Sequence, residues 1–194
     1  ETDQTGLELG SPVDGVEQME HQAVIALSHI PDQPGIAARL FETLSSAGIN
    51  VDLIIQSTHE GSSNDITFTV AEADLEAARS VSQTVLDSLG GELAAEGGMT
   101  KLSISGAGIM GRPGIAAGLF HCLSQQGINL RLIATSEVKV SCVIDADSGR
   151  KALQAVQEAF DVADAQVELN PDLSSSDVPE VRGVALDRDQ AQLS

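Results

Sequence analysis

Aromatic residues and positive charge are what this sequence has least of. Its 194 residues include no Trp, no Tyr and only four Phe, and 10 Lys and Arg stand against 29 Asp and Glu, for a formal net charge of −19. Proteins that bind single-stranded nucleic acid use aromatic stacking and cationic grooves, and anionic lipid attracts basic segments. The composition therefore argues against nucleic acid and against a membrane surface as partners.

Long apolar runs and cysteines are also scarce. No stretch approaches the roughly 18 to 20 apolar residues that span a bilayer, and no basic-then-apolar leader is recognisable. Cys122 and Cys142 are too few for a disulfide framework and lack metal-ligand spacing, so we expect two buried thiols and no metal site. These absences predict a cytoplasmic protein.

Aliphatic residues, by contrast, are plentiful. Hydrophobic residues make up 42% of the chain, which is enough to bury a core and argues against wholesale disorder. Residues 21–160 carry 15 acids and eight bases, so most of the negative charge lies in the terminal segments. We therefore expect an aliphatic core in the central part of the chain.

The chain contains an internal repeat. The segment Pro34–Phe41 recurs as Pro113–Phe120, and 14 of the 21 positions from 34 to 54 are identical to those 79 residues later. A weaker echo relates Val13–Val16 to Val181–Val184. The chain thus holds two copies of one module and the beginning of a third, which predicts that the parent protein continues beyond Ser194.

Both copies predict the same order of strands and helices. Short runs rich in β-branched residues are typical of strands, and apolar residues at helical spacing between Pro and Gly predict helices. In the first copy we expect strands at 23–27, 51–55, 65–70 and 92–96, and helices at 34–48 and 74–89. In the second we expect strands at 101–105, 129–134, 137–144 and 165–169, and helices at 113–126 and 149–160.

This β-α-β-β-α-β order is the ferredoxin-like split βαβ motif. The sequence therefore predicts an α+β fold with two tandem ferredoxin-like βαββαβ modules, whose open sheet edges favour pairing with another copy. The expected divisions are a linker and leading strand at 1–20, the two modules at 21–98 and 99–170, and a linker with the truncated third module at 171–194.

A glycine-rich motif occurs in the second copy alone. Gly106–Gly111 satisfies G-x-G-x-x-G between a strand and a helix, as in dinucleotide-binding proteins. The equivalent stretch of the first copy, Leu27–Asp32, has no glycine. A module of about 70 residues with an antiparallel strand pair also lacks the doubly wound half that holds a nucleotide. We therefore do not expect a dinucleotide site.

The loop before the first helix of each copy suits a carboxylate. Pro34 and Gly35 stand at the helix start, where backbone N–H groups have no intrahelical partner and the helix dipole is positive. An ordinary helix cap is the alternative interpretation. Asn50 and its counterpart Asn129 open the next strand nearby, and Asp32, Asp52 or Glu137 offers a partner for an ammonium group. This combination favours a free amino acid as ligand.

The sequence predicts no catalytic site. Its four histidines have no metal-ligand spacing, and the motifs of P-loop, serine-hydrolase and zinc-protease sites do not occur. Ser136 and Glu137 resemble a nucleophile and a base, but a turn between hairpin strands is the simpler interpretation. A regulatory or binding role is therefore favoured over catalysis.

Several segments carry a family resemblance. They are IPDQPGIAA at 30–38, NVDLIIQ at 50–56, NDITFT at 64–69, SGAGIMGRPG at 105–114 and LIATSEVKVS at 132–141. Over about residues 13–170 the chain closely resembles the tandem ACT-domain regulatory region of aspartate kinases. The start of a third module resembles the cyanobacterial form of the enzyme with four ACT modules, and a two-module form occurs as a separate regulatory subunit.

The resemblance implies feedback control by lysine, threonine or both, bound where ACT modules pair. In the first module it implies effector contacts from Asp32, Pro34, Gly35, Ala37, Asn50, Asp52 and Gln56. In the second it implies contacts from Met110, Ala116, Ala117, Asn129, Leu130, Thr135, Ser136 and Glu137. Because Asp32 corresponds to Gly111 and Asp52 to Arg131, the two pockets are not expected to be equivalent.

The resemblance also sets the expected partners. It implies a homodimer formed by ACT pairing and a kinase domain in the parent chain. It implies no cofactor in this chain, since ATP and Mg²⁺ belong to the kinase domain, whose nucleotide motif is absent here. Three alternatives stay open: an enzyme in its own right, a purely structural oligomerisation module, and an ACT module attached to another enzyme or regulator of amino-acid metabolism.

Overall fold

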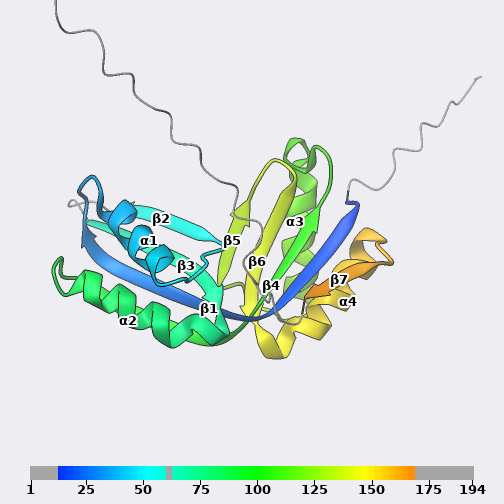
Figure 1. Cartoon of the computed structure of the whole chain (residues 1–194). Helices are drawn as coiled ribbons and strands as arrows, with labels where there is room; N and C mark the ends of the chain where they lie inside the picture. The colour runs from blue at the N-terminus through cyan, green and yellow to red at the C-terminus, as the bar shows by residue number, and fades with distance from the viewer. Residues whose placement is uncertain (1–12, 60–62, 169–194) are drawn as a thin grey trace, which may run out of the picture.

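One continuous sheet carries two pairs of helices (Figure 1). The computed structural model describes residues 13–59 and 63–168, so the predicted third module lies outside the described residues. The elements in chain order are β1 (Gly15–Pro31), α1 (Ile36–Ser46), β2 (Ile54–His59), β3 (Ser63–Ala71), η1 (Glu72–Asp74), α2 (Leu75–Leu86), β4 (Glu92–Ser105), η2 (Ile109–Gly111), α3 (Pro113–Gln125), β5 (Leu132–Thr135), β6 (Lys139–Asp145), η3 (Ala146–Ser148), α4 (Gly149–Phe160) and β7 (Ala165–Glu168).

The sheet has seven strands in the order β2-β3-β1-β4-β6-β5, with β7 paired to β1. Module 1 consists of the second part of β1, α1, β2, β3, α2 and the first part of β4. Module 2 consists of the rest of β4, α3, β5, β6, α4 and β7. Each module follows the β-α-β-β-α-β order, so the predicted α+β fold with two ferredoxin-like modules is confirmed.

Strands β1 and β4 run through both modules. The first residues of β1 lie between β4 and β7, because Gly15 pairs with Ser105 in an antiparallel ladder and Val16 pairs with Ala165 in a parallel one. The divisions expected at residues 21 and 99 therefore fall inside β1 and β4. The strands expected at 92–96 and 101–105 form one strand, since β4 continues through Gly97 and Gly98 with a local irregularity at Gly98, whose φ is 70°.

Each module has its own aliphatic core, as the composition predicts. In module 1, β1, β3, α1 and α2 enclose one cluster, which includes Leu40, Leu44 and Phe68. In module 2, β4, β6, α3 and α4 enclose a second, which includes Leu119 and Leu123. Most of the buried side chains of both clusters are Ala, Ile, Leu or Val. Both helices of each module therefore cover the same face of the sheet, and the other face carries no helix (Figure 1).

The two equivalent helices begin differently. Helix α3 begins at Pro113, as predicted, because proline needs no hydrogen-bond acceptor at the first helical position. Helix α1 begins two residues after Pro34, at Ile36, because Gly35 takes a left-handed conformation with φ 92°. Glycine adopts that conformation without the steric cost that other residues meet. The β1–α1 loop of module 1 thus extends two residues further than the repeat suggests.

Both cysteines are buried free thiols, as the sequence predicts. Burial raises the pKa of the Cys142 thiol from 9.0 to about 12, and the neighbouring Cys122 shifts it in the same direction. Burial also raises the pKa of Cys122. Because the thiolate is the reactive form, both groups are held in their unreactive state near neutral pH.

We expect neither thiol of the folded chain to react with a maleimide at pH 8, and both to react in guanidinium, as read by mass spectrometry. Cys142 ionises later in the folded than in the unfolded chain, so its contribution to stability is complete below pH 9 and is lost as the pH rises from 9 toward about 12. Rapid labelling of Cys142 under native conditions would contradict this account.

Candidate functional site

A cleft of about 300 Å³ lies where the loop between β1 and α1 faces strands β2 and β3. The strand register forms its floor, because Ile30 pairs with Asn64 and Gln56 pairs with Ile66. Directly paired residues point to the same face of a sheet, here the face that carries the helices. The cleft is lined by Ile30, Pro31, Asp32, Gln33, Pro34, Gly35, Ile36, Ala37, Gln56, Asn64 and Ile66.

Two polar side chains are joined in this cleft. The amide nitrogen of Asn64 donates a hydrogen bond of 2.8 Å to a carboxylate oxygen of Asp32. Asn64 is only 5% exposed, and its carbonyl oxygen Oδ1 is buried without a protein partner. A buried polar atom with no partner costs free energy, so this oxygen is poised to accept a hydrogen bond from a ligand. Asp32 is exposed and adds a negative charge beside it.

The opposite side of the cleft is the start of helix α1. The amide of Ile36 makes a long contact of 3.5 Å with the Gln33 carbonyl, and the first regular helical bond runs from the Arg39 amide to the Gly35 carbonyl at 2.9 Å. Ala37 therefore stands in the first turn, where amides have no intrahelical acceptor and the helix dipole is positive. A carboxylate near Gly35 and Ala37 would face these groups, while an ammonium group would face Asp32 and Asn64.

Five of the seven residues implied for module 1 line this cleft, and two do not. Asp32, Pro34, Gly35, Ala37 and Gln56 line it. Asn50 is exposed on the segment that joins α1 to β2. Asp52 pairs instead with Lys101 of module 2, and its amide donates to the Thr69 carbonyl.

Asn64 is a site residue that the sequence reasoning did not assign. It belongs to the NDITFT segment quoted for the family resemblance, but no side-chain role was inferred for it. The available signal was a polar residue at an inward-facing position near the start of a strand, two residues before the apolar Ile66. Such a position calls for a hydrogen-bond partner.

The residues implied for module 2 are mostly exposed. Ala116 and Leu130 are partly buried against the core of that module. Asn129, Thr135, Ser136 and Glu137 are exposed, as is Ala117, and the side chain of Met110 lies outside the described part of the chain. The Ser136 amide donates to the Lys139 carbonyl at 2.8 Å, so Ser136 and Glu137 form a turn between β5 and β6.

The register of the strands allows the two sites to be compared. Ile25 pairs with Phe68 in module 1, and its repeat counterpart Ile104 pairs with Val140 in module 2. Counting four residues back from each partner places Ser136 where module 1 has Asn64. The joined carboxylate and amide of Asp32 and Asn64 are thus replaced by Gly111 and Ser136. At these two positions module 2 therefore has no carboxylate.

Within residues 13–59 and 63–168 we find no group of three or more potential metal ligands. In the same part of the chain, no helix is long and apolar enough to cross a membrane. The sheet is antiparallel apart from the β1–β7 pair, so the G-x-G-x-x-G segment at 106–111 does not open a doubly wound nucleotide fold.

Comparison with known proteins agrees with this geometry. A family model of the ACT domain matches residues 25–84 and again 102–160. The regulatory subunit of aspartate kinase from Thermus thermophilus is 40% identical, with a TM-score of 0.72 over 77% of this chain and 99% of that one. The aspartate kinase structure from Synechocystis is 42% identical, with a TM-score of 0.79 over 94% of this chain and 32% of that one.

Among curated proteins, the aspartokinase of Thermus thermophilus is 38% identical over 161 residues, which are 82% of this chain and 40% of that protein. This chain therefore spans about 40% of the length of such a relative. Both modules match the ACT-domain model, and the chain aligns with nearly the whole of a solved regulatory subunit. The chain therefore belongs to the ACT-domain family, as a tandem ACT pair of the aspartate kinase regulatory type.

Proposed function

We propose that this chain is the allosteric effector-binding region of a cytoplasmic aspartate kinase and mediates feedback inhibition by lysine, threonine or both. The observation that carries the proposal is the module 1 cleft, in which the unpartnered Oδ1 of Asn64 and the Asp32 carboxylate face the start of α1. A free amino acid presents one group for each side: a carboxylate for the helix start and an ammonium group for Asp32 and Asn64.

Calorimetry of the chain with lysine and with threonine tests this proposal. We expect heat of binding and a rise in melting temperature with at least one of them at millimolar concentration. The N-acetylated amino acid, which lacks the ammonium group, and its amide, which lacks the carboxylate, are matched controls that should both bind more weakly. If both amino acids give neither heat of binding nor a thermal shift, the proposal is ruled out.

Gln56 and Asn50 offer a matched pair of substitutions. Gln56→Ala removes a polar group that lines the cleft, and we expect the effector dissociation constant to rise by about 3- to 10-fold, as for the loss of one hydrogen bond. Asn50→Ala removes an amide outside the cleft and should leave the affinity nearly unchanged. Both residues are exposed, so the melting temperature should stay within a few degrees. An equal loss of affinity in both variants would place the effector elsewhere.

Exposed apolar residues on the edge strands support a homodimer. Ile54 on β2 is 53% exposed and Ile133 on β5 is 43% exposed, and these strands are the two ends of the β2-to-β5 path. Edge strands with apolar side chains favour pairing with a second copy. A purely structural oligomerisation module would make the same contact. Sedimentation of the chain with and without lysine separates the two, because only an effector-binding pair should dimerise more tightly with the amino acid.

The kinase reaction itself, with ATP, Mg²⁺ and aspartate, is assigned to a catalytic region outside this chain. In this proposal the chain alone has no phosphotransferase activity. Effector binding to the chain shifts the equilibrium of the kinase toward its inhibited state, with a coupling free energy between the two sites of typically about 1–3 kcal/mol. Turnover of aspartate and ATP by the chain alone would overturn this division of roles. The four-module architecture stays a prediction from the family resemblance.

A further inference from the structure

The two modules also face each other across a second cleft, on the side of the sheet without helices. Its volume is about 450 Å³. Val24 and Ala26 alternate along β1 with the core residues Ile25 and Leu27, so they point away from α1 and α2. Together with Thr67 and Ala94 they form the module 1 wall, while Arg131 and Leu132 at the start of β5 form the module 2 wall.

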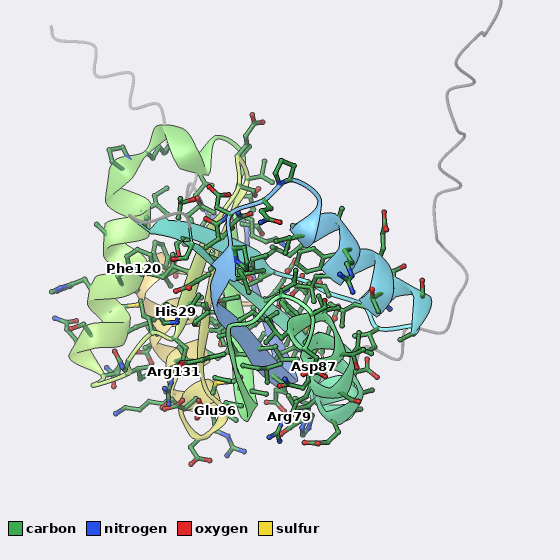
Figure 2. All side chains as sticks on the ribbon, turned by 90° about the vertical axis from the view of Figure 1, so that its left-hand side faces the viewer. His29, Arg79, Asp87, Glu96, Phe120 and Arg131 are labelled. Carbon is green, nitrogen blue, oxygen red and sulfur yellow. The ribbon has the colours of Figure 1, made fainter. Side chains whose placement is uncertain are left out.

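Two ion pairs join the modules beside this cleft. Lys101 on β4 pairs with Asp52 on the segment before β2. Arg131 pairs with Glu96 at 3.6 Å, and the two labelled residues lie close together in Figure 2. In both pairs the acid belongs to module 1 and the base to module 2. The Lys101 side chain is only 12% exposed, so solvent screens its attraction to Asp52 less than that of a fully exposed pair.

Arg131 is held in place from its own module. Its Nε donates a hydrogen bond of 3.0 Å to Asp145, the last residue of β6. This bond and the charges of Asp145 and Glu96 raise the pKa of Arg131 further above its ordinary value. The guanidinium group is therefore a fixed positive charge at the edge of module 2, and Glu96 is its partner across the cleft.

The strands that connect the modules are irregular at the same level. The β1–β4 register shifts between Met19 and Gln22, where His21 has a left-handed backbone with φ 54°, and Gly98 on β4 has φ 70°. Bulges of this kind bend a strand and interrupt its ladder. One side chain contacts both irregularities: Glu72 accepts a 2.9 Å hydrogen bond from the Gly98 amide and lies 3.6 Å from Nδ1 of His21.

Apolar contact between the modules is limited: among the described residues, Met99 and Val143 are the buried hydrophobic residues that belong to neither core cluster. The two core clusters share no residue, and the space between the helix-free faces is a cleft lined partly by small side chains. We infer that the pairs Asp52–Lys101 and Glu96–Arg131 form a clasp that sets the angle between the two modules, with the bulges at His21 and Gly98 as the hinge. The clasp needs no effector, so its test is independent of the proposed function.

Spin labels on the two modules can measure this angle in the intact chain. Ala77→Cys on α2 and Ala159→Cys on α4 provide exposed sites, and the native thiols are buried.

The clasp is opened by Asp52→Asn with Glu96→Gln. The control is Glu42→Gln with Glu92→Gln, which removes two exposed acids of module 1 away from the clasp. Both variants remove two negative charges from a chain whose net charge is −19, so any general relief of repulsion is the same in both.

We expect the clasp variant to shift and broaden the distribution of label distances measured by pulsed electron resonance, and the control to match the unmodified chain. An unchanged distribution in the clasp variant, or the same broadening in the control, overturns the inference. Should the clasp variant fail to fold, the single variant Glu96→Gln decides the matter, because it breaks only the more exposed pair, Glu96–Arg131. Broadening in that variant then supports the clasp, and an unchanged distribution overturns it.

Discussion

Replacing Asp32 by asparagine is expected to raise the effector dissociation constant of this chain about 10- to 100-fold. Asparagine keeps the shape of the side chain and an oxygen that accepts from the Asn64 amide, whose bond to Asp32 measures 2.8 Å. What it removes is the negative charge that faces the ammonium group of the amino acid. A hydrogen bond to a charged group contributes about 1.5–3 kcal/mol, and each 1.4 kcal/mol is a factor of ten in affinity.

The measurement is calorimetric titration of lysine and threonine into both proteins. Glu42→Gln is the matched control, because it removes the same charge from an exposed position farther along α1 that does not line the cleft. The control should bind like the unmodified chain, and both variants should melt within a few degrees of it, since Asp32 is exposed. An unchanged affinity in Asp32→Asn, or an equal loss in Glu42→Gln, would show that the effector does not use this carboxylate.

The repeat and the periodicity were sufficient to predict the fold. Helix α4 was predicted with its observed bounds. Both cores are mainly aliphatic, as the scarcity of aromatic residues in the sequence predicts. The continuity of β1 and β4 was not predicted, because local patterns treat Gly97 and Gly98 as a break. In the structure the β1–β4 ladder resumes after the bulge, since Met19 pairs with Lys101 on β4. That outcome depends on a partner far away in the sequence.

The site was predictable where the backbone defines it and less so where side chains cross between modules. The Pro34–Gly35 loop follows from helix-start chemistry, and it lines the observed cleft. Asp52 also satisfies the local pattern for an ammonium partner, but its carboxylate turns to Lys101 of the other module. A salt bridge between residues 49 positions apart leaves no trace in the local sequence. The same reason explains why Asn64 was not assigned to the cleft with Asp32.

Phe68→Ala is expected to destabilise the chain by about 3–5 kcal/mol, the usual cost of deleting a buried ring. Phe68 is fully buried in the core of module 1, and its ring packs edge-on against Phe41 with centroids 5.6 Å apart. Phe120→Ala is the matched control in module 2, where the ring is only partly buried against the core. We expect the control to lose less than half as much stability in urea denaturation.

The same variant tests whether the modules unfold as one unit. β1 has 17 residues and β4 has 14, and each contributes a strand to both modules. Melting module 1 would therefore strip module 2 of the ladder between Val16 and Ile104 and of the β1–β7 pairing. We accordingly expect Phe68→Ala to lower protection against hydrogen exchange in α4 of module 2 as well as in α1, with a single unfolding transition. Two separate transitions, with α4 still protected after α1 has melted, would mean that the bulges at His21 and Gly98 uncouple the modules.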